Sequence, residues 1–130
     1  MDFTTRKWVR PQDLNANGTL FGGSLLQWID EEAAIYAVVQ LGNERLVTKF
    51  MSEIDFESTA RQGDLIEMAV EATRFGRTSL TMRAEVRNMI TRRRILTIEK
   101  IVFVGLDDSG RPMEHGYTSA TSGNERLPTE

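Results

Sequence analysis

Residues 15–34, NANGTLFGGSLLQWIDEEAA, hold the residue types whose spacing is best suited to chemistry. Two glycines, Gly22 and Gly23, precede a helical pattern, and three consecutive acids follow within it. The start of a helix exposes about four backbone N–H groups without an intrahelical acceptor and carries a partial positive charge, so it can stabilise a carbonyl oxygen that becomes negative. A glycine lets a ligand approach that backbone closely, because no Cβ intervenes. This stretch therefore predicts an oxyanion site near a carboxylate.

Asp30 is the acid that the pattern singles out. It follows Leu26 by four residues and precedes Ala33 by three, which places it at the edge of the apolar stripe, about 10 Å along the helix axis from the glycines. Glu31 and Glu32 lie about 100° and 200° further around the helix, where water can hydrate them. A carboxylate beside apolar neighbours is costly unless hydrogen bonds or a function offset the cost. Asp30 is thus a candidate base or nucleophile, although spacing alone leaves a solvated helical face as the alternative.

The elements that must position these residues follow from hydrophobic periodicity. Apolar residues from about 23 to 41 recur every three or four positions, which predicts one helix, and Gly42 with Asn43 supplies its stop. Alternating or β-rich patterns predict strands at 3–9, 46–56, 65–75, 78–89 and 95–106. This order predicts an α+β fold in which a long antiparallel sheet wraps one central helix. One helix covers only one face of a sheet, and the strands carry apolar residues on much of both faces, so an oligomer is expected.

Length and composition bound the class of protein. The 130 residues fit one domain, with a core expected at about 3–108 and a loosely ordered C-terminal tail at 109–130. Sixteen Lys and Arg against nineteen Asp and Glu give a net charge of −3, which does not support nucleic-acid binding. No segment approaches the roughly 18 apolar residues that a membrane span needs, so no membrane partner is expected. The absence of cysteine excludes cysteine nucleophiles and fits a cytoplasmic location.

Several other chemistries lack their motifs. There is no phosphate-binding lysine loop and no His-rich metal pattern, and GTLFGG lacks the spacing of a dinucleotide-binding fingerprint. We therefore expect neither a metal nor a cofactor. The single histidine, His115, lies in a polar segment between turn residues and is expected to be a solvated loop residue rather than a catalytic base.

Four ordered blocks resemble a known family. They are RPQDLNANGTLFGGSLLQWID at 10–30, VTKFMSEIDFESTARQGDLIEM at 47–68, FGRTSLTMRAEV at 75–86 and IVFVGLDDSGRP at 101–112. Together they resemble the acyl-CoA thioesterases of the hotdog fold, in particular the broad-specificity bacterial acyl-CoA hydrolases and the related brain-type enzymes. The resemblance covers about residues 8–112. It implies a homodimer at least, in which two sheets join edge to edge, often assembled further as a trimer of dimers.

The resemblance also implies roles for individual residues. Asp30 matches the catalytic carboxylate, which either activates water or attacks the thioester directly. Asn15 matches the asparagine that the neighbouring protomer contributes to the same site. The thioester carbonyl would be held by the backbone N–H of Gly23, with Gly22 as a second donor. Active sites shared between two protomers follow from these roles.

The resemblance implies a second region that binds the substrate. The turn at Arg77, Thr78 and Ser79 corresponds to the part of the family that contacts the CoA moiety, although a plain hairpin turn remains an equal alternative. Residues 92–94 are three arginines that we interpret as a solvated turn outside the site, although such a cluster could bind the phosphates of CoA. Thr19 stands where bacterial relatives often carry an acid, which could alter ligand preference.

The sequence therefore predicts an acyl-CoA thioesterase that hydrolyses the thioester of fatty acyl-CoA to a free acid and CoA. CoA is part of the substrate in this prediction, and no metal or other cofactor is required. A non-catalytic acyl-CoA-binding or sensing protein of the same fold is the alternative, because a fold alone does not fix a function. The presence of both Asp30 and Asn15 favours the enzyme, because a sensor would need the pocket but not the carboxylate. A hotdog dehydratase would need a histidine in the helix region, and none is there.

Overall fold

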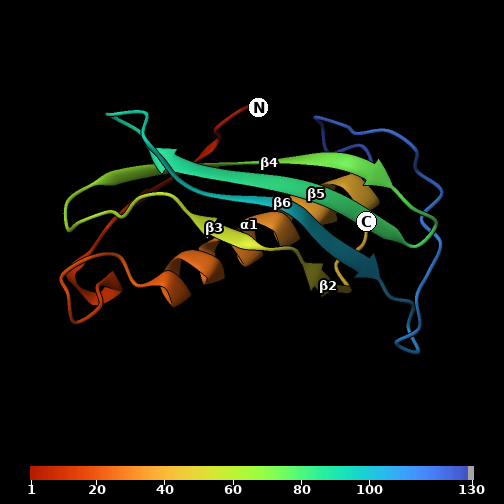
Figure 1. Ribbon diagram of the computed structural model, residues 1–130. Helices are drawn as coiled ribbons and strands as arrows, with labels where there is room; N and C mark the ends of the chain where they lie inside the picture. The colour runs from red at the N-terminus through yellow and green to blue at the C-terminus, as the bar shows by residue number, and fades with distance from the viewer. Residues whose placement is uncertain (129–130) are drawn as a thin grey trace.

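One helix lies against a curled antiparallel sheet in the computed structural model, which describes residues 1–128 (Figure 1). The elements in chain order are β1 (Thr5–Trp8), the 3-10 turn η1 (Pro11–Asp13), α1 (Gly22–Leu41), β2 (Leu46–Met51), β3 (Ile54–Phe56), β4 (Leu65–Phe75), β5 (Ser79–Asn88) and β6 (Arg94–Gly105). The strand order is β1-β4-β5-β6-β2, and β3 pairs with another part of β6. The predicted α+β arrangement is confirmed. No helix within residues 1–128 is long and apolar enough to cross a membrane.

The helix α1 presents one continuous buried face to the sheet. Leu25, Ile29, Ala33 and Ala37 recur every four residues, and each is at most 1% exposed. The two small side chains, Ala33 and Ala37, allow close packing between helix and sheet. The helix ends at Gly42, which adopts the left-handed conformation (φ 64°) and donates its N–H to the carbonyl one turn earlier at 2.8 Å. The predicted helix at 23–41 agrees with these bounds.

The two faces of the sheet differ strongly in polarity. Alternate residues of β4 and β5, such as Ile66, Met68, Leu80 and Met82, are buried in the core with α1. Several residues between them carry charges, and ion pairs at 2.6–3.0 Å join Arg87 with Glu67, Arg83 with Glu99, and Arg94 with Glu85. The expectation of apolar residues on much of both faces therefore fails over β4 and β5, whose outer side carries these charged residues. The case for an oligomer rests on the sheet edge instead.

The strand expected at 46–56 was also wrong in detail, because it is divided into β2 and β3. Ser52 lies at the break: its N–H donates to the carbonyl of Lys100 at 2.8 Å, and its hydroxyl accepts from the N–H of Lys100 at 3.1 Å. A side-chain hydroxyl thus takes the place of a backbone carbonyl, and the regular ladder stops there. The other strands agree with their expected ranges within two residues at each end.

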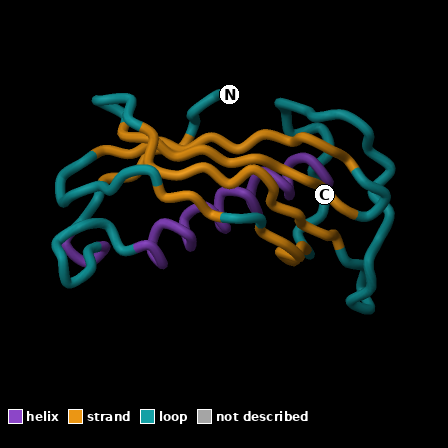
Figure 2. The backbone as a smooth tube through the Cα atoms, in the orientation of Figure 1, coloured by secondary structure: helices purple, strands orange, loops and turns teal. Residues whose placement is uncertain are grey.

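After β6, residues 107–128 form neither helix nor regular strand, and Figure 2 shows them as a loop at one end of the sheet. This segment contacts the end of α1. The buried amide of Gln40 exchanges two hydrogen bonds of 2.8 Å with the backbone of Thr121. Arg126 donates to the carbonyl of Gln40 at 3.0 Å and stacks on the ring of Tyr117. The division into a core and a tail stays a prediction, and residues 129–130 of the expected tail lie outside the described residues.

Candidate active site

The start of α1 has backbone donors without partners inside the helix. Phe21 occupies the N-cap position and makes no side-chain cap, and its own N–H donates to the carbonyl of Asp13 at 2.8 Å. The N–H groups of the first turn, including those of Gly22 and Gly23, have no intrahelical acceptor. A Cβ at residue 23 would come within 2.6 Å of the Phe21 ring, so a larger residue here would require the half-exposed ring to move. The ring of Phe56 lies beside Gly22, and both phenyl rings are about half exposed.

The motif that precedes this helix is structural. The buried carboxylate of Asp13 accepts the backbone N–H of Arg10 at 2.9 Å and two guanidinium contacts of 3.2 Å from the same residue. These hydrogen bonds hold the pKa of Asp13 below its ordinary range. Pro11 fits the first position of the short 3-10 turn between the two residues. Because the carbonyl of Asp13 accepts the N–H of Phe21, this pair fixes the direction from which the chain enters α1.

Asn15 organises the loop in which it lies. Its Oδ1 accepts the backbone N–H groups of Asn17 and Thr19 at 2.9 and 3.2 Å. Its Nδ2 donates to the hydroxyl of Thr19 at 3.0 Å, which leaves the second Nδ2 hydrogen for another acceptor. Thr19, noted above for its departure from the family pattern, is thus the internal partner of Asn15. None of the hydrogen bonds within residues 1–128 joins Asn15 to Asp30.

Asp30 is half-buried and accepts a hydrogen bond of 2.7 Å at Oδ1 from the hydroxyl of Thr48. This length is typical of an O–H···O hydrogen bond. Thr48 lies on β2 and was missed at the sequence level, because no spacing links residues 30 and 48. Glu31 is exposed, as expected, whereas Glu32 accepts a hydrogen bond from Thr5. Of the three acids, Asp30 is the one whose carboxylate accepts a hydrogen bond from β2.

The strand β2 forms an open edge of the sheet beside Asp30. Within residues 1–128 it pairs only with β6, so its other edge has no strand partner. Val47 and Phe50 on this strand are 44% and 49% exposed. An unpaired edge with exposed apolar side chains favours association with another chain. Through Thr48, Asp30 lies next to this edge.

The turn at Arg77, Thr78 and Ser79 lies at the opposite end of the sheet from the start of α1 (Figure 1). Glu114 pairs with the guanidinium of Arg77 at 2.9 Å, and both side chains are mostly exposed. His115 donates its backbone N–H to the carbonyl of Arg77, and its ring Nε2 lies 3.0 Å from the carbonyl of Ser79. The solvated interpretation of His115 was wrong, because its ring holds this turn. One protomer does not bring the turn and Asp30 together.

Among residues 1–128, no group of three potential ligand side chains could hold a metal ion. The remaining functional features are a carboxylate, an uncapped helix start and an open sheet edge. This set suits the stabilisation of an oxyanion together with general base or nucleophilic chemistry.

Residues 17–93 match the model of the thioesterase superfamily. The chain belongs to the thioesterase superfamily. It is 32% identical over 108 residues to an uncharacterised acyl-CoA thioester hydrolase of Bacillus subtilis, an alignment that covers 81% of this chain and 62% of that protein. The chain thus spans somewhat less than two thirds of that relative.

Solved structures of thioesterases share this fold. An apo-hexameric acyl-CoA thioesterase aligns with a TM-score of 0.79 at 34% identity and covers 94% of this chain and 79% of that chain. The acyl-CoA hydrolase of Staphylococcus aureus, in complex with butyryl coenzyme A and coenzyme A, aligns with a TM-score of 0.76 at 31% identity. The alignment covers 85% of this chain and 66% of that chain. Structures of its variants have alanine in place of one aspartate, one threonine or one asparagine. The predicted hotdog fold and the predicted thioesterase family are confirmed.

Proposed function

We propose that this thioesterase hydrolyses acyl-CoA to a free acid and CoA, with Asp30 as general base or nucleophile and the start of α1 as the oxyanion site. The observation that carries the proposal is the position of Asp30, which Thr48 holds beside an open sheet edge two helical turns after an uncapped helix start. The names of the relatives support acyl-CoA as the substrate class.

The spacing of the two groups suits a thioester carbonyl. Asp30 follows Gly23 by seven residues, which corresponds to about 10 Å along the helix axis. Side chains of a helix lean toward its N-terminus, so the carboxylate of Asp30 reaches back toward the glycines. A reacting carbonyl needs a nucleophile at about 3 Å from its carbon and a donor at about 3 Å from its oxygen. The interval between Asp30 and Gly23 leaves room for both distances.

Two routes complete the reaction. In the first, Asp30 takes a proton from water, the hydroxide attacks the carbonyl carbon, and the oxyanion accepts the N–H of Gly23 before the C–S bond breaks. CoA leaves as the thiolate and takes up a proton. In the second, the carboxylate of Asp30 attacks the carbonyl, and water then hydrolyses the resulting anhydride. Neither route requires a metal or redox cofactor. Incorporation of ¹⁸O from labelled water into Asp30 in a single turnover would identify the second route.

The second protomer completes the site in this proposal. The edge of β2 pairs with the same edge of another chain, and the loop of Asn15 from that chain reaches Asp30, where the free Nδ2 hydrogen orients water or substrate. Asn15 and Asp30 are fifteen positions apart, and the asparagine and aspartate replaced in the S. aureus variants are separated by the same interval. The hexameric relative supports assembly as a trimer of dimers.

The CoA moiety contacts the turn of Arg77, Thr78 and Ser79 in the proposed complex. Because this turn lies at the far end of the sheet, we assign it to a site whose Asp30 comes from another protomer. The exposed guanidinium of Arg77 supplies a charge for the CoA phosphates. The cytoplasmic location expected from the cysteine-free composition stays a prediction.

Thiol release from short-, medium- and long-chain acyl-CoA tests this function. Asp30→Asn should lower kcat by about 100-fold or more, the range for loss of a general base, while CoA binding persists. Glu31→Gln is the matched control, because it removes the adjacent exposed carboxylate and should leave kcat unchanged. If the wild-type protein binds acyl-CoA but releases no thiol at any chain length, the enzyme proposal fails and the non-catalytic binding protein is the correct interpretation.

A further inference from the structure

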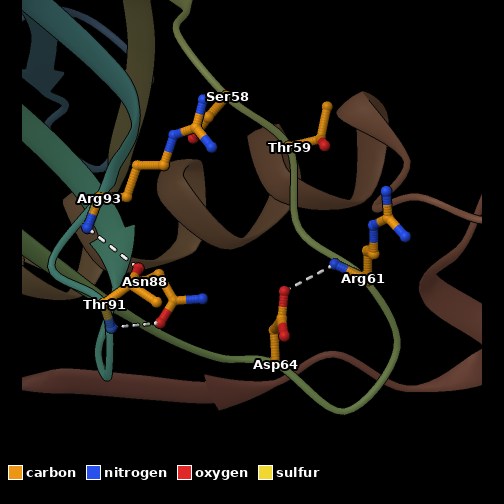
Figure 3. Close-up of a pocket in the computed structure, with 7 residues that line it drawn as sticks. All are labelled: Ser58, Thr59, Arg61, Asp64, Asn88, Thr91 and Arg93. Atoms are coloured by element: carbon orange, nitrogen blue, oxygen red, sulfur yellow. Dashed lines mark hydrogen bonds between the residues drawn. The ribbon is translucent and has the colours of Figure 1, made fainter.

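A cavity of about 440 Å³ lies between the loop that enters β4 and the turn that joins β5 to β6 (Figure 3). Its wall includes Thr59, Arg61 and Asp64 from the loop and Asn88, Thr91 and Arg93 from the turn. None of these residues belongs to the proposed catalytic set. Two of the guanidinium groups that the proposed function leaves unused therefore line one cavity.

The charges in this cavity favour an anion. No carboxylate within residues 1–128 forms an ion pair with Arg61 or Arg93, whereas the neighbouring Arg94 pairs with Glu57 and Glu85. The one acid of the wall, Asp64, accepts the backbone N–H of Arg61 at 2.9 Å. Two guanidinium groups and one carboxylate leave a net positive charge.

The neutral groups of the wall add donors. The Oδ1 of Asn88 accepts the backbone N–H groups of Ile90 and Thr91 at 2.9 and 3.0 Å. These bonds fix the orientation of the amide, and its Nδ2 points into the cavity (Figure 3). The hydroxyl of Thr91 accepts the N–H of Arg93 at 3.2 Å, so its hydrogen is free to donate. Amide, hydroxyl and guanidinium donors together match the oxygens of a phosphate group.

The turn that carries Arg93 is held in a costly conformation. Arg92 has φ 66° and is the only non-glycine residue with positive φ among residues 1–128. The N–H of Arg92 donates to the carbonyl of Asn88 at 2.9 Å, and the N–H of Asn88 donates to the carbonyl of Arg93 at 2.8 Å. Such strain persists only where the surrounding structure determines it, and it often occurs at binding sites. Here it keeps Arg93 beside Asn88.

We propose that this cavity binds a phosphoanion. The anion comes either from the phosphates of acyl-CoA, in which case the inference rests on the proposed function, or from a free phosphoanion such as inorganic pyrophosphate. The cavity is linked to the proposed active site, because Arg61 forms an isolated β-bridge with Thr19, whose hydroxyl accepts from Asn15. The N–H of Leu20 also donates to the carbonyl of Ala60 at 2.8 Å. A phosphoanion bound here lies against the loop that positions Asn15.

Calorimetric titration with pyrophosphate and thioesterase kinetics test the site in Arg61→Gln and Arg93→Gln. The control is Arg92→Gln, which removes a cation from the same turn but not from the wall of the cavity. Each wall variant should weaken pyrophosphate binding or raise the KM for acyl-CoA by about tenfold, the loss of one charge-assisted contact. The control should change either quantity less than twofold.

The substrate separates the two sources of the anion. If KM rises for acyl-CoA but not for acyl-pantetheine, which lacks the phosphates, the site binds the substrate. If only pyrophosphate binding weakens, the site binds a free phosphoanion, and this result supports it even when the protein hydrolyses no thioester. If the wild-type protein binds no pyrophosphate and the wall variants leave KM unchanged, or if Arg92→Gln has the same effect as they do, the proposal is overturned. Hydrolysis by the wild-type protein would then leave the proposed function intact.

Discussion

The hydrogen bond between Thr48 and Asp30 leads to a sharp prediction. Thr48→Val removes the hydroxyl but keeps the β-branched shape that suits a strand. The acceptor of this 2.7 Å bond is a carboxylate, and hydrogen bonds to charged groups contribute about 1.5–3 kcal/mol. Thr48 is exposed, so water can replace part of this contribution and the lower value applies. Since about 1.4 kcal/mol corresponds to a factor of ten in rate, kcat should fall about tenfold.

Thiol-release kinetics with acyl-CoA would measure this effect. Thr48→Ser keeps the hydroxyl and should retain most of the activity. Thr73→Val is the matched control, because Thr73 is also an exposed strand threonine whose hydroxyl donates a hydrogen bond, but to the carbonyl of Thr81. It should turn over at the wild-type rate. If Thr48→Val, Thr48→Ser and the wild-type protein have the same kcat, the hydroxyl does not position a catalytic carboxylate and the reasoning is refuted.

Two further predictions concern the helix entry and the CoA turn. Asp13→Asn should lower the free energy of unfolding at pH 7 by about 1 kcal/mol, because the contacts with Arg10 lose their charge. Arg10 depresses the pKa of Asp13 in the folded state. The stabilisation is therefore complete above the pKa of Asp in the unfolded chain, near 3.9, and is lost as the pH falls through the folded pKa. The urea midpoints of variant and wild type should converge toward pH 2. Glu114→Gln frees Arg77 and removes a carboxylate that repels phosphate. The KM for acyl-CoA should therefore fall two- to fivefold, which corresponds roughly to the free energy of a surface ion pair. Asp108→Asn, which breaks the comparable surface pair with Arg45, should not change KM, and an unchanged KM in Glu114→Gln would count against a CoA contact at this turn.

Local periodicity was enough to predict most of the fold. The helix and the long strands β4, β5 and β6 were predicted within two residues at each end, because each carries a repeating apolar pattern bounded by turn residues. The division between β2 and β3 could not be predicted, because it depends on Ser52 bonding to Lys100, 48 residues away. The charged outer side of β4 and β5 differs from the expectation because burial follows alternate residues of a strand rather than its total apolar content.

In the candidate site, too, the residues related within one element were predicted and the contacts between elements were not. Gly23 and Asp30 were singled out because helical spacing fixes their relation within one element. Thr48 was missed because only the packing of α1 on the sheet brings it to Asp30. The contact of His115 with Ser79 spans 36 positions, so no local pattern around His115 predicts it. Contacts between distant residues therefore account for what the sequence did not predict.

Subunit complementation tests the two-protomer active site most directly. Asp30→Ala and Asn15→Ala homodimers should each be inactive, and mixing them under conditions that exchange subunits should create one intact site in every heterodimer. Random exchange makes half of the dimers heterodimers, so the mixture should recover roughly a quarter of wild-type activity per subunit. Confirmed heterodimers that release thiol no faster than either parent would contradict a site built from Asp30 of one protomer and Asn15 of its partner.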